Sequence, residues 1–238
     1  MAYNNARHGL QQSSSVLSVD TRVAHCTPSC TTNIAFATHP NDNERSTRSA
    51  MARVDGVAER RGPWVRLTSS VVHTNPWYSV RRDEVIRPDG SPGDYFTVES
   101  SPASFVVAFD DRGRIALVRL YRYTVDRWSL EVPAGSCESG ETPLSAAQRE
   151  LAEETGFAAS RWAPLGVFFP ANGLLREENH VFVARGLSHI GGDQQAAEGI
   201  DEVRFVTIDE AWALVTKGEI SDAQTVTALA LATQRHQD

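Results

Sequence analysis

Beyond residue 64, most of the chain consists of short runs of β-branched and aromatic residues in which apolar and polar positions alternate. A two-residue alternation predicts strands with one buried face, and the Gly, Pro and Asp clusters between the runs predict turns. Residues 110–113, for example, predict the turn of a hairpin. The strands expected on this basis are residues 64–73, 77–87, 95–99, 104–109, 114–121, 128–132, 165–169, 179–184 and 202–207.

Three other segments carry helix signals. Thr142 is suited to cap a helix, Pro143 occupies the favoured first position, and Gly156 ends the helix. Residues 209–217 predict a second, short helix, and Ser221 predicts the cap of a last one. Many strands, one central helix and further helices near the end predict a mixed α/β fold.

The first fifty residues have a different composition. They are rich in Ser, Thr and Asn, show no sustained helical or strand period, and carry four Arg against three acidic residues. We expect residues 1–50 to be a tail, 51–63 a linker, and 64–238 the folded domain, with a strand-rich first part over 64–99. Met51 is an alternative start of translation, and a transit peptide fits less well because the segment contains acidic residues.

Composition and charge exclude several classes of protein. The 238 residues are 41% hydrophobic and 22% charged, and no window holds the eighteen consecutive apolar residues that a membrane-spanning helix needs. The first residues lack the apolar stretch of a secretory signal, and three cysteines do not make a disulfide scaffold. A formal net charge of −7 argues against general nucleic-acid binding but permits phosphate binding through metal ions. We therefore expect a cytoplasmic protein that binds neither nucleic acid nor membrane.

The central helix carries the densest chemistry. Glu150, Glu153 and Glu154 lie at positions i, i+3 and i+4, so their carboxylates can converge on one side. Such crowding is unfavourable unless a cation lies among the carboxylates, and hard oxygen ligands favour Mg²⁺ or Mn²⁺. Arg149 can hold the arrangement by reaching Glu153 or a loop acid, and Gly135 lets a backbone carbonyl approach the same metal. The alternative interpretation is an ordinary solvent-exposed acidic helix face.

Segment 135–157 matches, without a departure, the pattern Gly-x5-Glu-x7-Arg-Glu-U-x-Glu-Glu-x-Gly-U, where U is a bulky apolar residue. Seven positions are fixed, so a chance match in this chain is roughly one in a million at ordinary residue frequencies. The pattern is the Nudix box, and the chain resembles the Nudix hydrolase family. The resemblance implies a mixed β-sheet sandwiched between helices, and hydrolysis of a nucleoside diphosphate linked to another moiety. It also implies that Glu150, Glu153, Glu154 and the backbone carbonyl of Ala134 bind metal ions.

The sequences that flank the box resemble the ADP-ribose pyrophosphatase branch of the family. Upstream stands Tyr-Arg-Tyr and then Trp-x-x-Glu-x-Pro-Ala-Gly; downstream stand FFPANGLLREENHVFVARGL and GEISDAQTVTALALA. The resemblance spans roughly residues 64–235 and implies that ADP-ribose is split into AMP and ribose 5-phosphate, with other nucleoside diphosphate sugars as close contenders. One departure leaves the exact substrate open, because Ala and Asn separate Pro170 from Gly173 where many members have Pro-Gly directly.

The resemblance also suggests a proton acceptor. Glu177 aligns with the loop acid that serves such enzymes as base or metal ligand, and its neighbour Glu178 is the alternative. In the expected mechanism the box glutamates hold two or more Mg²⁺ ions, a bound water attacks the diphosphate, and Glu177 takes the proton of that water. Glu153 is the candidate base if neither loop acid serves.

Three residues before the box are candidates for substrate binding. Arg122 can bind a phosphate bidentately, or else it pairs with an acid on a strand surface. Glu131 alternates with Leu130, so it either lines the site or is a charge on the sheet surface. Trp128 can border the base pocket, although packing in the core is the better-supported interpretation.

The branch also implies homodimers in which the N-terminal strands, here about 64–99, help to build the partner's site. Two other functions compete with this one. A nucleoside triphosphatase acting on damaged nucleotides would use the same metal centre, but the long strand-rich segment before the box argues against it. A nucleotide-sensing regulator would need a DNA-binding module and is expected to lose box carboxylates, yet all are present and no basic helix-turn-helix pattern is visible.

Overall fold

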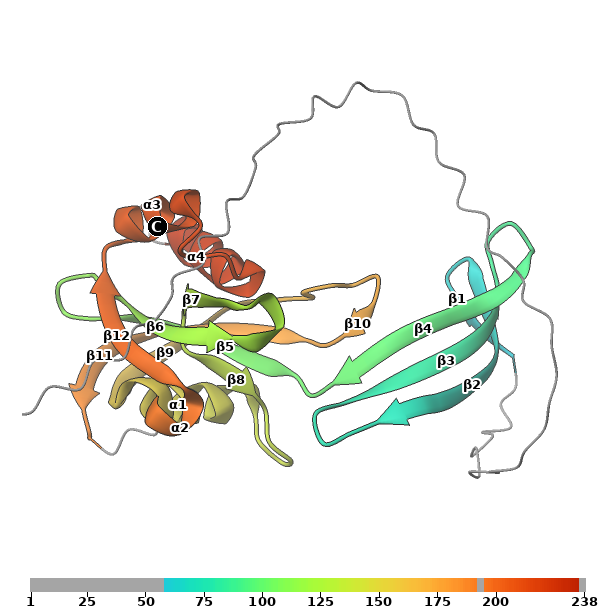
Figure 1. Cartoon of the computed structure of the whole chain (residues 1–238), viewed down its shortest axis with the longest axis horizontal. Coiled ribbons are helices and arrows are strands. Elements are labelled where there is room, and N and C mark those ends of the chain that lie inside the picture. The colour runs from blue at the N-terminus through green and yellow to red at the C-terminus, as the bar shows by residue number, and fades with distance from the viewer. Residues whose placement is uncertain (1–57, 192–194, 236–238) are drawn as a thin grey trace, which may run out of the picture. The chain divides into compact units, whose positions relative to one another are not determined.

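The computed structural model of the protein describes residues 58–191 and 195–235, which build two β-sheets (Figure 1). The predicted tail 1–50 lies outside these residues, as does most of the predicted linker. The end of that linker is a strand instead, because Glu59–Arg61 pairs antiparallel with the strand that follows it. The first sheet has the order β1-β2-β3-β4-β10, with β1 (Glu59–Arg61), β2 (Trp64–Thr74), β3 (Tyr78–Ile86), β4 (Pro92–Ser100) and β10 (Leu175–Arg176).

The second sheet is mixed and carries the helices. Its order is β12-β6-β5-β11-β9, while β7 pairs with β6 and β8 pairs with β5. Its strands are β5 (Ala103–Phe109), β6 (Ile115–Arg122), β7 (Arg127–Glu131), β8 (Ala134–Ser136), β9 (Phe157–Phe168), β11 (Asn179–His189) and β12 (Ile200–Val206). The helices are α1 (Pro143–Thr155), α2 (Gln195–Glu198), α3 (Ile208–Lys217) and α4 (Ala223–Arg235), with a 3₁₀ turn η1 over Tyr123–Val125.

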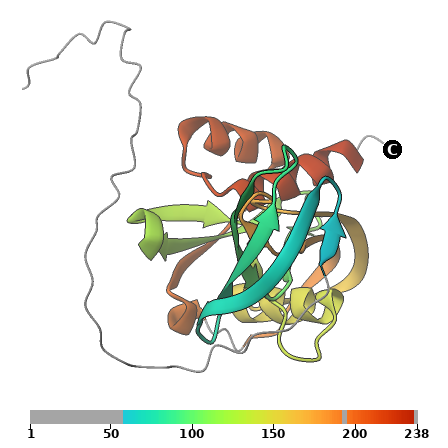
Figure 2. The ribbon, with the colours of Figure 1, turned by 90° about the vertical axis from the view of Figure 1, so that its right-hand side faces the viewer.

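Helices cover both faces of this second sheet (Figures 1 and 2). On one face Ala147 and Leu151 of α1 pack against Val106 and Phe182. On the other face, residues of α3 and α4 form the larger core with the sheet, including Leu214, Ala228, Leu229, Phe105, Val107 and Leu117. The predicted mixed sheet between helices is thereby confirmed.

Several predicted boundaries shift. Strand β4 begins at Pro92, inside the predicted turn, and β9 begins at Phe157 because it pairs antiparallel with β11 over most of its length. The predicted cap of the last helix is wrong by one residue. The Thr225 N–H donates to the Asp222 carboxylate at 2.7 Å and α4 begins at Ala223, so Asp222 rather than Ser221 caps the helix.

Strands β5 and β6 separate soon after the hairpin that joins them. The two strands pair only at Phe109 and Ile115, next to the hairpin. Beyond that point β5 pairs with β8, whereas β6 pairs with β7. This divergence positions the candidate site, because a pocket opens between the two strand pairs.

Candidate active site

Helix α1 carries the box residues and is fixed at both ends. The Thr142 side chain accepts from the Ser145 N–H, and the Ser145 hydroxyl accepts from the Thr142 N–H, which completes a capping box. Pro143 supplies the first helical position, and Gly156 ends the helix in a left-handed conformation with φ of 73°. The predicted cap Thr142, the first residue Pro143 and the end of the helix at Gly156 are all confirmed. Glu150, Glu153 and Glu154 therefore lie on the helix with the spacing that the sequence predicts.

Arg149 ties the helix to the loop before it. Its guanidinium donates to Glu141 at 3.0 and 3.1 Å, to Glu150 at 2.7 Å and to Glu153 at 3.0 Å, and also to the Ser136 carbonyl at 3.0 Å. These carboxylates, Glu141 first, raise the pKa of Arg149. Both predicted contacts of Arg149, with Glu153 and with a loop acid, are present.

Glu150 and Glu154 are the buried members of the box. Their exposed fractions are 9% and 6%, and Glu154 Oε2 accepts from the Ala134 N–H at 2.9 Å. Burial raises the pKa of Glu150, and it raises the pKa of Glu154 to about 8. Because desolvation disfavours an isolated carboxylate, both groups are in an environment that a cation would make more favourable.

Gly135 lets the strand approach these carboxylates. A Cβ atom at Gly135 would lie 1.9 Å from Glu150 Oε1, so only glycine permits the present contact. The backbone at Ala134 and Gly135 therefore lies directly against Glu150 and Glu154, as the metal-ligand prediction requires.

Carboxylate and carbonyl oxygens are suitable ligands for a hard cation, but the box carboxylates in this structure are hydrogen-bonded to other groups of the protein. Among residues 58–191 and 195–235, no three His, Cys, Asp or Glu side chains are grouped closely enough to hold a metal ion. Arg149 binds Glu150 and Glu153, and the Ala134 N–H binds Glu154. Buried carboxylates beside backbone carbonyls are nevertheless the ligand chemistry of Mg²⁺.

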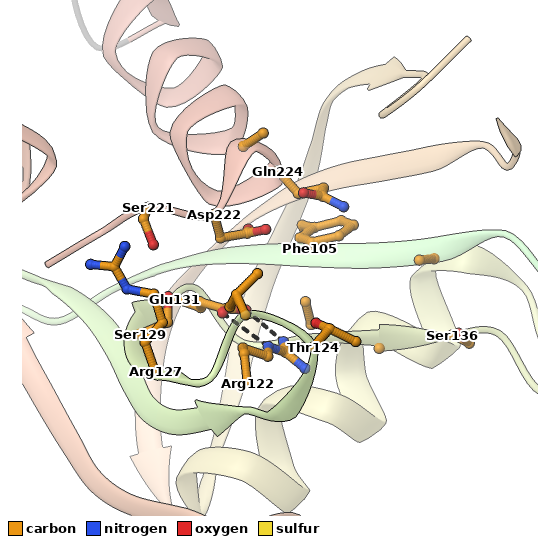
Figure 3. Close-up of a pocket in the computed structure, with 15 residues that line it drawn as sticks. Phe105, Arg122, Thr124, Arg127, Ser129, Glu131, Ser136, Ser221, Asp222 and Gln224 are labelled. Atoms are coloured by element: carbon orange, nitrogen blue, oxygen red, sulfur yellow. Dashed lines mark hydrogen bonds and ion pairs between the residues drawn. The ribbon is translucent and has the colours of Figure 1, made fainter. Parts of the chain in front are cut away.

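A pocket of about 590 Å³ adjoins the box at Ala134 and Gly135. Its walls come from β5, from the β6–β7 hairpin, from β8 and from the start of α4 (Figure 3). Arg122 and Glu131, both predicted to bind substrate, line it. The Arg122 guanidinium donates to both carboxylate oxygens of Glu131, with Nε at 3.0 Å from Oε1.

This pair joins an exposed group to a buried one. Glu131 is 4% exposed, and the Arg122 side chain is 47% exposed. The hydrogen bonds to Glu131 raise the pKa of Arg122, and the charges of Asp222 and Glu154 add to the effect. Glu131 is thus a wall residue that orients Arg122, rather than a charge on the sheet surface.

Trp128, the third candidate for substrate binding, does not line this pocket. Ser129 and Glu131 share the pocket face of β7, and Trp128 therefore points to the opposite face. There the Arg119 guanidinium lies 4.1 Å from its ring centroid and Tyr121 contacts it edge-on. The interpretation that Trp128 packs in the core is wrong, because the side chain is 42% exposed.

The two loop acids have hydrogen-bond or ion-pair partners outside the box. Glu177 accepts a hydrogen bond from the Ser100 hydroxyl, because β10 runs parallel to β4 and brings these residues together. Glu178 is exposed, and its carboxylate lies 3.7 Å from His180. No hydrogen bond or ion pair recorded for the described residues joins either acid to Glu150 or Glu154.

The structure instead brings Glu198 to the box, a residue that the sequence did not single out. Helix α2 packs against α1, and the negative charge of Glu198 contributes to the raised pKa of both Glu150 and Glu154. Glu198 is exposed. Its only signal in the sequence is an acid next to Gly199 before a strand, which is too common to identify a site.

Known proteins resemble this chain in both sequence and fold. The ADP-ribose pyrophosphatase of Bacillus subtilis (strain 168) is 35% identical over 148 residues, which cover 62% of this chain and 80% of that protein. The ADP-ribose pyrophosphatase of Mycobacterium tuberculosis (strain ATCC 25618 / H37Rv) is 37% identical over 156 residues, 65% of this chain and 75% of that protein. A crystal structure of an ADP compounds hydrolase shares the fold, with a TM-score of 0.64 and 21% identity over 72% of this chain and 93% of that chain.

Family profiles match both parts of the described chain. The profile of a nucleoside diphosphate sugar hydrolase N-terminal domain matches residues 64–98, the predicted strand-rich segment. The profile of the NUDIX domain matches residues 100–229. Within the described ranges, no helix is long and apolar enough to cross a membrane. Since the NUDIX match covers more than half of the chain and includes the helix with the box glutamates, the chain belongs to the Nudix hydrolase family.

Proposed function

We propose that the protein hydrolyses the diphosphate bond of a nucleoside diphosphate sugar, with ADP-ribose, cleaved to AMP and ribose 5-phosphate, as the first candidate substrate. One observation carries the proposal: the buried box carboxylates share Ala134 and Gly135 with a pocket lined by Arg122. The names of the relatives and of the N-terminal family support the substrate class.

The box residues would hold Mg²⁺, or Mn²⁺ in its place. Glu150, Glu154 and the Ala134 carbonyl are the ligands that the buried geometry favours, and Glu153 completes the set on the same helix. The cation would neutralise phosphate oxygens and lower the pKa of a bound water. Arg149 keeps the box helix and its loop together, so it positions the ligands rather than touching the substrate.

The residues of the chain supply orientation and proton transfer. Arg122, held by Glu131, faces the pocket and can donate two hydrogen bonds to one phosphate. The oxygen of water forms a bond to phosphorus, the anhydride P–O bond breaks, and the other phosphate leaves with the electron pair. The proton of the water passes to a carboxylate.

We propose Glu198 as that carboxylate, in place of Glu177. The charge of Glu198 acts on both Glu150 and Glu154, whereas Glu177 is hydrogen-bonded to Ser100. An exposed acid next to the box can reach the attacking water once substrate and cation are in place. Glu177 then has a structural role between β4 and β10.

A substrate panel tests the proposed function. ADP-ribose, ADP-glucose, UDP-glucose and nucleoside triphosphates are assayed side by side with Mg²⁺, and Glu154→Gln is the matched inactive control. We expect kcat/KM to be highest for a nucleoside diphosphate sugar. Preference for a triphosphate, or equal turnover in the Glu154→Gln variant, would contradict the proposal.

We also propose that the protein is a cytoplasmic homodimer formed through its N-terminal sheet. That sheet and its β2–β3 turn expose large apolar side chains that a monomer rarely leaves in water: Leu67, Val71, Val72, Trp77, Tyr78 and Phe96. Light scattering after size-exclusion chromatography would test the dimer. Replacing Trp77, which is 78% exposed, with Ser should shift the protein toward monomer.

A further inference from the structure

Between β7 and β8 the chain passes from one strand partner to another within two residues. Strand β7 pairs with β6 up to Glu131, and β8 pairs with β5 from Ala134 onward, so Val132 and Pro133 form a crossing between the two pairings. The crossing leads into Ala134, whose N–H donates to the Glu154 carboxylate at 2.9 Å and whose carbonyl is a proposed cation ligand. The backbone of the crossing therefore sets the position of Ala134.

The two residues of the crossing are held by groups on different elements. The Pro133 carbonyl accepts from the Val106 N–H of β5 at 2.9 Å. The Val132 N–H donates to the Thr225 hydroxyl oxygen of α4 at 3.2 Å. Val132 is 1% exposed and Thr225 is fully buried. Because a buried N–H needs a partner within the protein, the crossing depends on a side chain 93 residues further along the chain.

Thr225 is itself fixed at the start of its helix. Its N–H donates to the Asp222 carboxylate at 2.7 Å, which caps the first turn of α4. Figure 3 shows this start of α4, with Asp222, beside the strands that build the pocket. The segment before the helix also contacts β7, because the Leu130 N–H donates to the Glu219 carbonyl at 3.1 Å. The Leu130 N–H thus bonds to a backbone carbonyl and the Val132 N–H to a side chain, so a substitution can remove the second bond alone.

We infer that Thr225 is a positioning residue for the cation site: its hydroxyl holds Val132, and through Val132 it holds the Ala134 carbonyl in place. The inference rests on the proposed function, because it concerns the cation that this function requires. Without the hydroxyl, the Val132 N–H would be buried without a partner, which costs free energy unless the backbone moves. Such a movement would displace Ala134, which contacts Glu154 and would ligate the cation.

Variants at this one position isolate the hydroxyl group in the full-length chain. Thr225→Ser keeps the hydroxyl and loses the methyl group, whereas Thr225→Ala loses both, so these two variants differ by one oxygen atom. Thr225→Val replaces the hydroxyl with a methyl group of similar size. Thr227→Ser and Thr227→Ala form the matched control pair, because the Thr227 hydroxyl donates to the Ala223 carbonyl within α4 at 2.8 Å. Melting curves establish which variants fold.

Binding of Mn²⁺ alone is measured by titration with electron paramagnetic resonance, which detects the free ion and does not depend on turnover. We expect Thr225→Ala and Thr225→Val to raise the dissociation constant for Mn²⁺ by about 10-fold, the lower end of the effects seen when groups that support metal ligands are removed. Thr225→Ser should bind Mn²⁺ at least about fivefold more tightly than Thr225→Ala. The Thr227 pair should differ by less than about twofold.

A purely structural role for Thr225 predicts a different result. Equal Mn²⁺ affinity in Thr225→Ser and Thr225→Ala, whatever their melting temperatures, would show that the hydroxyl only stabilises the fold and would overturn the inference. Should Thr225→Ala and Thr225→Val fail to fold, Thr225→Cys takes their place, since a thiol accepts a hydrogen bond only weakly. Mn²⁺ affinity in Thr225→Cys equal to that in Thr225→Ser would then overturn the inference.

The failure of the proposed function can be told apart from the failure of this inference. A protein that binds Mn²⁺ but cleaves no nucleotide sugar would contradict the proposed function, and the Mn²⁺ affinities of the Thr225 variants would still decide the role of Thr225. Absence of saturable Mn²⁺ binding in the unaltered protein would overturn the cation site and the inference together.

Discussion

Replacing Glu154 with Gln should stabilise the metal-free protein, and by an amount that grows with pH. Glu154 is buried and has a pKa of about 8, against an ordinary value of 4.5. Between these pH values the native protein holds a proton that the unfolded chain has released. The raised pKa therefore contributes stability that is complete below about pH 4.5 and is lost as the pH rises toward 8.

The size of the effect follows from the single proton that native Glu154 retains, and the unfolded chain has lost, between about pH 4.5 and pH 8. Each pH unit between the two pKa values changes the free energy of unfolding by about 1.4 kcal/mol. Between pH 5 and pH 7 the difference between Glu154→Gln and the unaltered protein should therefore widen by about 2.5 kcal/mol. In a domain of this size that corresponds to about 5–10 °C in melting temperature.

Denaturation curves at pH 5 and pH 7 in the presence of a chelator measure the difference. Glu210→Gln is the control. Hydrogen bonds at the start of α3, first the one from the Thr207 backbone, lower the pKa of Glu210. Its contribution to the free energy of unfolding should therefore stay nearly constant between pH 5 and pH 7. At pH 7, Mg²⁺ should raise the melting temperature of the unaltered protein and have little effect on Glu154→Gln. A difference that stays constant or narrows from pH 5 to pH 7 would refute the reasoning.

Three further predictions concern the base, the strand contact and the N-terminal segment. Glu198→Gln should lower kcat by about 10²–10⁴-fold at saturating Mg²⁺, and Glu177→Gln by much less; the reverse order would return the role of base to Glu177. Gly135→Ala should displace the Glu150 carboxylate and raise the Mg²⁺ concentration needed for half-maximal turnover, while costing less than about 1 kcal/mol in denaturation, since a flexible side chain can shift. Deletion of residues 1–50 should leave turnover and melting temperature unchanged, because that sequence lacks apolar periodicity; aggregation of the shortened protein would contradict this.

The box helix could be predicted from the sequence because its determinants are local. Thr142, Pro143 and Gly156 specify the ends of α1 within a single segment, and the spacing of the glutamates then fixes which side they occupy. The contact of Arg149 with Glu153 spans one helical turn and is equally local. Such features depend little on how the rest of the chain folds.

The face of β7 on which Trp128 lies could be predicted from the sequence. Alternation along β7 places Ser129 and Glu131 on one face, so the same alternation places Trp128 on the other. The strand was predicted correctly, but core packing, the favoured interpretation of Trp128, is wrong because the side chain is 42% exposed. Phe105 is the aromatic residue that lines the pocket.

Glu198 could not be found in this way, because its place depends on tertiary structure. It is 44 residues beyond Glu154, and it reaches the box because α2 packs against α1. The same holds for Asp222, which the sequence identified only to within one residue as a helix cap. Its position in the pocket depends on where α4 crosses the sheet.

The candidate cation ligands and the adjoining pocket both depend on the separation of β5 from β6. Past Phe109 and Ile115, β5 pairs with β8, and this pairing brings Ala134 and Gly135 against the glutamates of α1. The same separation leaves space between β5 and β7, which α4 closes at its far end. A diphosphate at Ala134 and Gly135 would therefore lie between the cation ligands on one side and the pocket on the other. The fold thus places the candidate cation ligands and the pocket next to each other through one divergence of strands.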